Sequence, residues 1–253
     1  VIAFRLLPKD VAVDVFSYIP SDKQTAIYML ANENELAETV NDLFFDDKID
    51  FLEEMPANVV KAILKNSSDA ERKLINQFLK YPDSSAGGLM TIEFVDLQKD
   101  MSVAQALDRV RATAPNKETV YTCYCIDSSR KLEGTVSLKD LVMAAPNTIV
   151  DDIMQKDALW VDTHEDQENI AFLFKKYDLL SLPVVDREQR LVGIITVDDV
   201  VDVIDRETTE DFHLMAAVHG GAKKDKLLQV SIPTAIRYRL PWLIITLFGG
   251  MLA

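Results

Sequence analysis

Two segments of the sequence, LEGTVSLKDLV at residues 132–142 and LVGIITVDDVV at residues 191–201, match one another at an offset of 59 residues. The apolar strand and the aspartate just upstream of each segment keep the same offset. Farther upstream, Leu89–Thr91 resembles Ile153–Gln155, and each is followed by a strand and an amphipathic helix. Each unit therefore predicts strand, helix, strand, turn, strand and helix. Two such units predict one compact α/β module, because each leaves an apolar sheet face for the other to cover.

The two segments share a motif of Gly, two apolar residues, Ser or Thr, two further residues and Asp. This motif resembles the signature of cystathionine-β-synthase (CBS) domains, which occur in tandem pairs. Its members are Gly134, Ser137 and Asp140 in the first copy and Gly193, Thr196 and Asp199 in the second. In that family the hydroxyl and the aspartate often hold a ribose at the cleft between repeats. The residues alone also predict helix caps, because Ser and Thr side chains accept hydrogen bonds from the free N–H groups at helix starts.

The CBS resemblance implies ATP or AMP as a candidate ligand. The residues that we expect to form its cleft are Tyr124, Lys139, Asp140, Pro183 and Thr196. One position departs from the nucleotide-binding pattern, since Leu179 stands where relatives place an aromatic ring against adenine. Leucine can line a base pocket but cannot stack as an aromatic ring does. Nucleotide binding is therefore a second hypothesis, beside the cation hypothesis developed below.

Residues 1–88 carry apolar side chains at helical spacing and no clear strand pattern. Residues 14–20 align with residues 50–56 at a spacing of 36, and both segments end in proline. Because proline suits the first turn of a helix, each copy predicts the end of one helix and the start of the next. Repeated helix pairs of this period predict a small solenoid-like superhelix. Asp50 and Glu54 are its most obvious candidate cation ligands, and a solvated helix surface is the alternative.

The chain has 41 acidic and 27 basic residues, and its net charge of −14 disfavours nucleic acid as a partner because phosphates need Lys and Arg. The charge is unevenly spread. Residues 151–211 hold 17 acidic and six basic residues, whereas residues 212–253 hold one acidic and five basic residues. An acidic region beside a basic tail predicts a cation, a membrane, or both as partners.

The start of the chain and its cysteines bear on its compartment. The first residue is Val1, and no charged-then-apolar leader follows, so we expect no signal peptide and a piece without its native start. The cysteines, Cys123 and Cys125, are too close in sequence for a disulfide that would cross-link distant parts of the fold, which suggests a reducing compartment. Because strand side chains alternate, the two thiols share one face of a strand, and we expect them in the core.

The segment at residues 198–211 holds seven acidic side chains and one base, Arg206. The acidic residues are Asp198, Asp199, Asp202, Asp205, Glu207, Glu210 and Asp211. If the segment is helical, like charges one turn apart each cost roughly a few tenths of a kcal/mol, so a cation or a basic partner is needed to neutralise them. A divalent cation that prefers oxygen ligands and keeps several waters needs only one or two carboxylates from each of two domains. The three histidines are too dispersed for a zinc site, and a solvated acidic face is the alternative.

The last fourteen residues, LPWLIITLFGGMLA at residues 240–253, carry no charge. A membrane span needs about 20 apolar residues, so this run is short, but it is still apolar where the sequence stops. Arg237 and Arg239 precede it, as expected on the cytoplasmic side of a span, and Trp242 suits the interface. We expect the start of a first transmembrane helix here, with a helix packed into a soluble core as the alternative.

The order of these segments resembles the cytosolic half of MgtE-type magnesium transporters. The run YPDSSAGGLMT at residues 81–91, the acidic stretch at residues 198–211 and RLPWL at residues 239–243 carry this resemblance. It implies an α+β multidomain fold with a helical domain, two CBS repeats and a connecting helix. The predicted parts are the helical domain at 1–88, the CBS repeats at 89–150 and 151–211, the connecting helix at 212–239 and the start of the first transmembrane helix at 240–253.

The same resemblance implies a homodimeric, channel-like Mg²⁺ transporter of the cell membrane, with this region in the cytoplasm and the pore in a membrane domain absent from the chain. Several Mg²⁺ ions bound between acidic faces would favour the closed pore. The ligands carried over from the family are Asp83, Glu168, Asp178, Asp199, Asp202, Glu207, Glu210 and Asp211. The alternative is a nucleotide-sensing CBS module of another membrane transport protein. We expect no enzymatic activity, because the sequence has no Ser–His–Asp set, no phosphate-binding Gly-rich loop and no zinc motif.

Overall fold

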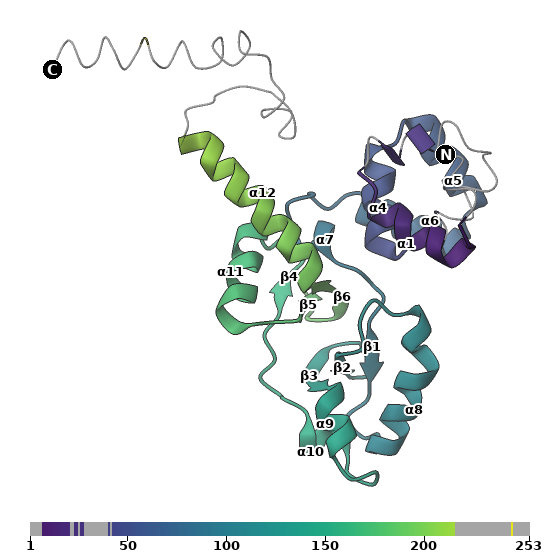
Figure 1. Cartoon of the computed structure of the whole chain (residues 1–253). Coiled ribbons are helices and arrows are strands. Elements are labelled where there is room, and N and C mark those ends of the chain that lie inside the picture. The colour runs from purple at the N-terminus through teal and green to yellow at the C-terminus, as the bar shows by residue number, and fades with distance from the viewer. Residues whose placement is uncertain are drawn as a thin grey trace, which may run out of the picture. The chain divides into compact units, whose positions relative to one another are not determined.

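The computed structural model describes residues 7–20, 23, 24, 26, 27, 40, 42–215 and 244 of the chain. The chain divides into two units, Val1–Val197 and Asp198–Ala253, which we describe separately. Figure 1 labels the helices and strands. No helix in the described ranges combines the length and the apolar character of a membrane span. The predicted first span at 240–253 lies outside the described residues apart from Ile244, and the predicted connecting helix at 212–239 does so beyond Met215.

Helices dominate the described part of the helical domain, residues 1–88, as the apolar spacing predicts. They are α1 (Lys9–Ser17), α4 (Phe45–Glu54), α5 (Ala57–Asn66) and α6 (Asp69–Phe78). Pro56 is the N-cap residue of α5 and follows the end of α4, so this proline divides two helices as predicted. Aromatic rings pack between the helices, with centroids 5.4 Å apart for Phe16 and Phe51 and 4.6 Å apart for Phe45 and Phe78. Such pairs contribute about 1 kcal/mol each beyond their buried area.

A buried charge links two of these helices. The Lys48 ammonium on α4 lies 2.9 Å from the Glu71 carboxylate on α6, and the Lys48 side chain is only 6% exposed. Ser68 caps α6 by accepting a hydrogen bond from the Glu71 N–H. Removing one partner of a buried ion pair typically costs about 3–5 kcal/mol, because the other charge is left in the interior. The pair therefore fixes α4 against α6.

The two predicted repeats fold into two similar three-stranded sheets. The first repeat contains β1 (Val95–Leu97), α8 (Val103–Thr113), η2 (Ala114–Asn116), β2 (Thr122–Ile126), β3 (Leu132–Ser137) and α9 (Leu138–Met143). The second contains α10 (Val150–Ile153), β4 (Val161–Asp162), α11 (Gln167–Tyr177), β5 (Ser181–Val185) and β6 (Leu191–Thr196), and α12 (Val197–Met215) follows it. In each sheet the first strand runs parallel to the second, and the second runs antiparallel to the third. The predicted order of strands and helices is confirmed in both repeats.

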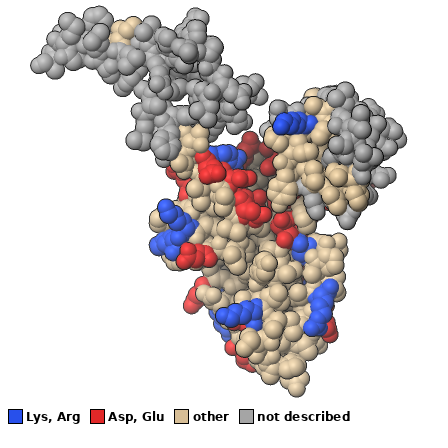
Figure 2. All heavy atoms as spheres, in the orientation of Figure 1, with Lys and Arg blue, Asp and Glu red and all other residues tan. Residues whose placement is uncertain are grey.

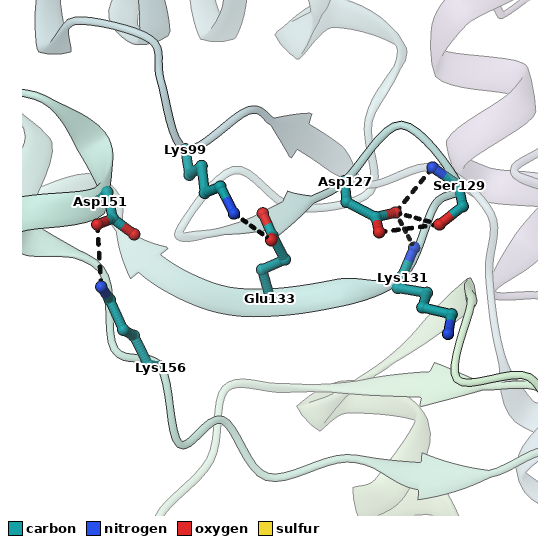
Figure 3. Close-up of polar contacts among 7 residues, drawn as sticks. All are labelled: Lys99, Asp127, Ser129, Lys131, Glu133, Asp151 and Lys156. Carbon is teal, nitrogen blue, oxygen red and sulfur yellow. Dashed lines mark hydrogen bonds and ion pairs between the residues drawn. The ribbon is translucent and has the colours of Figure 1, made fainter.

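The aspartate that follows the second strand of each sheet closes the next turn. The Asp127 carboxylate accepts hydrogen bonds from the hydroxyl and N–H of Ser129 and from the Lys131 N–H, all at 2.8 Å (Figure 3). These bonds, led by the one from the Ser129 hydroxyl, hold the pKa of Asp127 below its usual range. In the second repeat, Asp186 accepts from the backbone N–H groups two and four residues later. The repeated aspartate is thus a turn residue.

Each repeat is completed by a segment that precedes the other repeat. Thr91, ahead of β1, pairs with Ile194 of β6 through two backbone N–H···O bonds of 2.8 and 2.9 Å. Gln155, ahead of β4, pairs in the same way with Thr135 of β3. The glycine of the CBS motif permits this crossing, since a Cβ on Gly193 would lie 2.8 Å from the Thr91 carbonyl oxygen. The two repeats are therefore interlocked.

Strand β2 faces two different cores. Cys123 and Cys125 are fully buried within the first repeat, as predicted, and burial raises the pKa of both thiols to about 12. The thiols are therefore protonated at neutral pH. Tyr124 between them points the other way, with its hydroxyl 2.6 Å from the Ser181 hydroxyl of β5 and its ring edge against Phe94. Burial raises the pKa of the Tyr124 phenol, so this buried hydroxyl ties the two sheets together as a neutral group.

Candidate functional site

Residues 81–91 join the helical domain to the first repeat and are docked on the second. Their short helix α7 (Ala86–Leu89) is capped by Ser85, whose hydroxyl accepts a hydrogen bond from the Gly88 N–H. The Ala86 and Gly87 N–H groups donate to backbone carbonyls of the β4–α11 loop, both at 2.8 Å. A Cβ on Gly87 would lie 2.9 Å from one of these carbonyl oxygens, which explains the glycine. This segment is therefore a fixed support for the side chains that it carries.

Asp83 in this segment lies near Glu53 of α4, whose other acidic neighbour is Asp50 on the same helix. The pKa of Glu53 is raised from 4.5 to about 7, first by burial of its carboxyl and then by the charges of Asp83 and Asp50. Neighbouring carboxylates raise one another's pKa because each disfavours ionisation of the next. All three side chains are nevertheless exposed at the surface, so water and ions reach them. We call Asp50, Glu53 and Asp83 the acidic cluster.

The acidic cluster suits a hydrated divalent cation. Mg²⁺ is usually held by one or two carboxylates and keeps several of its waters, whereas a cage of protein ligands is rare for this ion. Among the described residues, no three His, Cys, Asp or Glu side chains form such a cage. On the face drawn in Figure 2, acidic and basic side chains both occur, and several of the acidic side chains lie next to one another. A cation bound at the cluster would relieve the repulsion that adds to the effect of burial on the pKa of Glu53.

The acidic cluster contains two residues that the sequence singled out and one that it did not. Asp83 and Asp50 were candidate ligands, and Glu53 was not. The signal for Glu53 was its spacing, since a residue three positions after Asp50 lies on the same face of a helix. Glu54, the other candidate in the helical domain, is the last residue of α4, and its side chain lies outside the described parts of the chain.

Glu168 and Asp178 lie at opposite ends of α11, so the structure does not bring these two candidates together. Glu168 is in the first turn, where its N–H donates to the Asp166 carboxylate at 2.9 Å. Asp178 is the C-cap residue and has a left-handed backbone, with φ of 51°. Ten residues of helix correspond to about 15 Å. As cation ligands both stay predictions, and each would belong to a different site.

The remaining predicted cation ligands lie on α12, whose residues from Asp198 onward belong to the second unit. The predicted acidic helix is confirmed and runs without a break from Val197 to Met215. Its buried residues alternate with exposed and half-buried acidic ones. Val200 and Val203 are buried, Asp202 is exposed, and Asp199 and Glu207 are half-buried. Glu210 and Asp211 lie in the last two turns of the helix, and their side chains are outside the described residues.

The predicted nucleotide residues divide into exposed and buried ones. Ser137 caps α9, because its hydroxyl accepts from the Asp140 N–H at 3.0 Å and donates to the Asp140 carboxylate at 2.6 Å. Asp140 and its neighbour Lys139 are exposed. The other three candidates, Tyr124, Pro183 and Thr196, have buried side chains. The cap that the sequence predicted at Ser137 is confirmed, and the ligand role of this set stays a prediction.

Comparison with known proteins agrees with this arrangement. The family model described as the MgtE intracellular N domain matches residues 1–84, and the CBS domain model matches residues 150–206. A crystal structure of the cytosolic domain of the Mg²⁺ channel MgtE in complex with ATP is 38% identical, with a TM-score of 0.76, covering 80% of this chain and 83% of that one. The chain belongs to the MgtE family.

Two curated members of the MgtE family extend the match over nearly the whole chain. The magnesium transporter MgtE of Thermus thermophilus is 38% identical over 99% of this chain, and that of Bacillus subtilis is 32% identical over 98%. The chain spans 56% and 54% of these relatives, or about half their length. The family resemblance and the α+β multidomain fold are thus confirmed, and the two relatives are named as transporters. The predicted domain boundaries at residues 88, 150 and 211 stay predictions.

Proposed function

We propose that this chain is the cytosolic, Mg²⁺-sensing region of a magnesium transporter of the cell membrane, in which bound Mg²⁺ favours the closed pore. The observation that carries the proposal is the match to MgtE proteins, and the acidic cluster, in which Glu53 of α4 lies near Asp83 and Asp50, supports it. These carboxylates repel one another in the absence of a cation, and they come from α4 and from the segment docked on the second repeat. The names of the relatives support magnesium as the ion.

The mechanism follows from where the repulsion acts. Because Asp83 is fixed on the second repeat, a cation between Asp83 and α4 would hold the helical domain close, and loss of the cation would let it move away. The ion therefore has a higher affinity for the closed arrangement, which a population shift requires. Further ions would be held by the family ligands on α11 and α12. These are Glu168, Asp178, Asp199, Asp202, Glu207, Glu210 and Asp211.

A homodimer is part of the proposal. Several large apolar side chains are exposed on helices of the two repeats, among them Met143 on α9, which is 78% exposed, and Phe172 on α11, which is 56% exposed. Exposed apolar surface of this kind suits an interface, and two-fold symmetry would bring two copies to one membrane surface. Equilibrium sedimentation should show a dimer at micromolar concentration. A monomer both with and without Mg²⁺ would contradict this part.

The experiment that tests sensing compares Mg²⁺ with NaCl at equal ionic strength, because simple screening responds to both salts. Millimolar Mg²⁺ should raise the melting temperature and reduce the radius of gyration of wild type, and Asp83→Asn should weaken both effects. Asp69→Asn, on the exposed face of α6, is the matched control, since its side chain is 93% exposed and lies outside the acidic cluster. Equal responses to the two salts would refute Mg²⁺ sensing.

A test of the predicted Mg²⁺ ligands on α12 requires the full-length transporter. Asp199→Asn, Asp202→Asn and Glu210→Gln combined remove repulsion together with ligands, so transport should continue at high internal Mg²⁺. If transport by the triple variant still stops at the wild-type Mg²⁺ concentration, Mg²⁺ is sensed by other residues.

Nucleotide binding is the second candidate function. Asp140 carries it, because its exposed carboxylate stands at the end of β3 beside the Ser137 hydroxyl. The MgtE cytosolic domain that was crystallised with ATP supports this reading. Isothermal titration of the chain with ATP should show binding that Asp140→Asn weakens, whereas Asp100→Asn, an exposed acid of the same repeat, should not. ATP binding without any Mg²⁺ response would favour the nucleotide-sensing alternative.

A further inference from the structure

The start of α4 is capped by a residue of the first repeat. Its own N-cap residue, Phe44, makes no side-chain hydrogen bond to the helix. The Phe45 N–H donates to Oε2 of Glu93, which lies 3.0 Å away and 48 residues later in the sequence. A carboxylate in this position satisfies a free N–H and interacts favourably with the helix dipole. The helical domain thus takes the cap of one of its helices from the CBS module.

Glu93 is itself held in place from both repeats. The Thr91 hydroxyl donates to the same Oε2 atom at 2.6 Å. Thr91 is completely buried, and its backbone pairs with Ile194 of β6 in the second repeat. The Glu93 carbonyl accepts a hydrogen bond of 2.9 Å from the N–H of Glu118, in the connection between α8 and β2 of the first repeat. The carboxylate is therefore a fixed point that does not depend on α4 for its position.

The two ends of α4 are therefore held differently. At its start the Phe45 N–H is fixed by the 3.0 Å hydrogen bond to Glu93, whereas its last turn carries Glu53 of the acidic cluster. The eight residues from Phe45 to Glu53 correspond to about 12 Å of helix. We propose that Glu93 is a positioning residue on which α4 pivots, so that the start of α4 stays attached to the first repeat while the acidic cluster opens and closes.

This inference rests on the proposed function only where Mg²⁺ is concerned. The cap itself is present without any cation, and removing it touches no candidate Mg²⁺ ligand. Loss of a helix cap corresponds to roughly a fivefold change in an equilibrium constant. If α4 closes the acidic cluster by pivoting on Glu93, loss of the cap frees the start of α4 in the open arrangement, so closure must order more of the chain and the Mg²⁺ concentration for half-maximal compaction should rise.

The test compares three variants of the whole chain. Glu93→Ala removes the acceptor, Glu93→Gln keeps an acceptor oxygen without the charge, and Asp100→Ala removes an exposed charge from the same repeat as a control. Without Mg²⁺, hydrogen exchange at the Phe45 amide, followed by NMR, should be about fivefold faster in Glu93→Ala, intermediate in Glu93→Gln and unchanged in Asp100→Ala. Circular dichroism and thermal unfolding establish that each variant is folded.

The second part of the test is an Mg²⁺ titration followed by small-angle scattering. Glu93→Ala should reach half-maximal compaction at a higher Mg²⁺ concentration than Asp100→Ala. Unchanged Phe45 exchange in folded Glu93→Ala would overturn the cap, and faster exchange with an unchanged Mg²⁺ midpoint would overturn the pivot. Faster exchange combined with no Mg²⁺ response in wild type would support the cap and count against the proposed function.

Discussion

Replacing Glu53 by Gln should stabilise the helical domain at pH 8 and have little effect at pH 5. The pKa of this carboxyl is raised from 4.5 to about 7 in the folded chain. Between these two values the folded state binds more protons than the unfolded state, so the free energy of unfolding falls as the pH rises through this window. Glutamine cannot ionise, so the variant escapes that loss.

The size of the effect follows from the pKa shift and the exposure of the side chain. A full shift from 4.5 to about 7 corresponds to roughly 3 kcal/mol at about 1.4 kcal/mol per pKa unit. Because Glu53 is exposed, solvent screening reduces this to about 1 kcal/mol. For a domain of this size, 1 kcal/mol shifts the melting temperature by roughly 4–8 °C.

The assay is thermal unfolding of wild type, Glu53→Gln and the control Asp69→Asn at pH 8 and pH 5, with and without millimolar Mg²⁺. The Glu53→Gln gain should be present at pH 8, mostly lost at pH 5, and smaller at pH 8 when Mg²⁺ is added, because the cation already neutralises the cluster. A carboxyl titration by NMR supplies the pKa directly. A gain of equal size at both pH values, or a Glu53 pKa near 4.5, would refute the reasoning.

Three further predictions concern the parts that hold the chain together. Glu71→Gln should destabilise the helical domain by about 1.5–3 kcal/mol, because it removes the carboxylate charge that lies 2.9 Å from the buried Lys48 ammonium; thermal unfolding measures this, and no measurable change would contradict it. Gly87→Ala should loosen the segment before the first repeat, since the added methyl meets a backbone carbonyl oxygen at 2.9 Å, and faster limited proteolysis there is the expected readout; an unchanged digest would speak against a tight fit. Tyr124→Phe should cost about 1–2 kcal/mol by leaving the buried Ser181 hydroxyl without this partner, equally at pH 6 and pH 9 because the phenol stays neutral; a pH-dependent loss in urea unfolding would show otherwise.

The repeat in the sequence predicted the sheets because it reports local periodicity and turn residues. The aspartates after β2 and β5 and the glycines of the CBS motif stand where the backbone needs them, so each copy of the pattern carries its own geometry. The offset between the repeats changes from 64 residues before the second strand to 59 after it. The structure explains the change, since residues 114–121, including η2, connect α8 to β2, whereas residues 178–180 connect α11 to β5.

Contacts between segments far apart in the chain could not be predicted from the sequence in the same way. Glu53 and Asp83 are 30 residues apart, and Phe45 and Glu93 are 48 apart, so no periodicity relates the members of either pair. Asp83 emerged from the family resemblance, whereas Glu53 looked like any exposed helix acid. Tyr124 was assigned to a ligand cleft from the CBS resemblance, whereas its buried hydrogen bond to Ser181 depends on how one sheet packs on the other. Such pairs are decided by tertiary packing rather than by local sequence.

The pairing of Thr91 with Ile194 has a consequence for how the chain is made. Thr91 leaves the ribosome about 100 residues before its partner, which at typical rates of synthesis is roughly 5–20 s. Throughout that interval the segment before β1 has no sheet edge to join, and the first repeat itself is complete only once Gln155, ahead of the second repeat, has been made. A nascent chain stalled between the repeats would expose unpaired backbone and apolar surface, and would be a natural substrate for chaperones. Deleting or exchanging one repeat alone should therefore yield an insoluble product, and the two repeats are expected to be inherited as a pair.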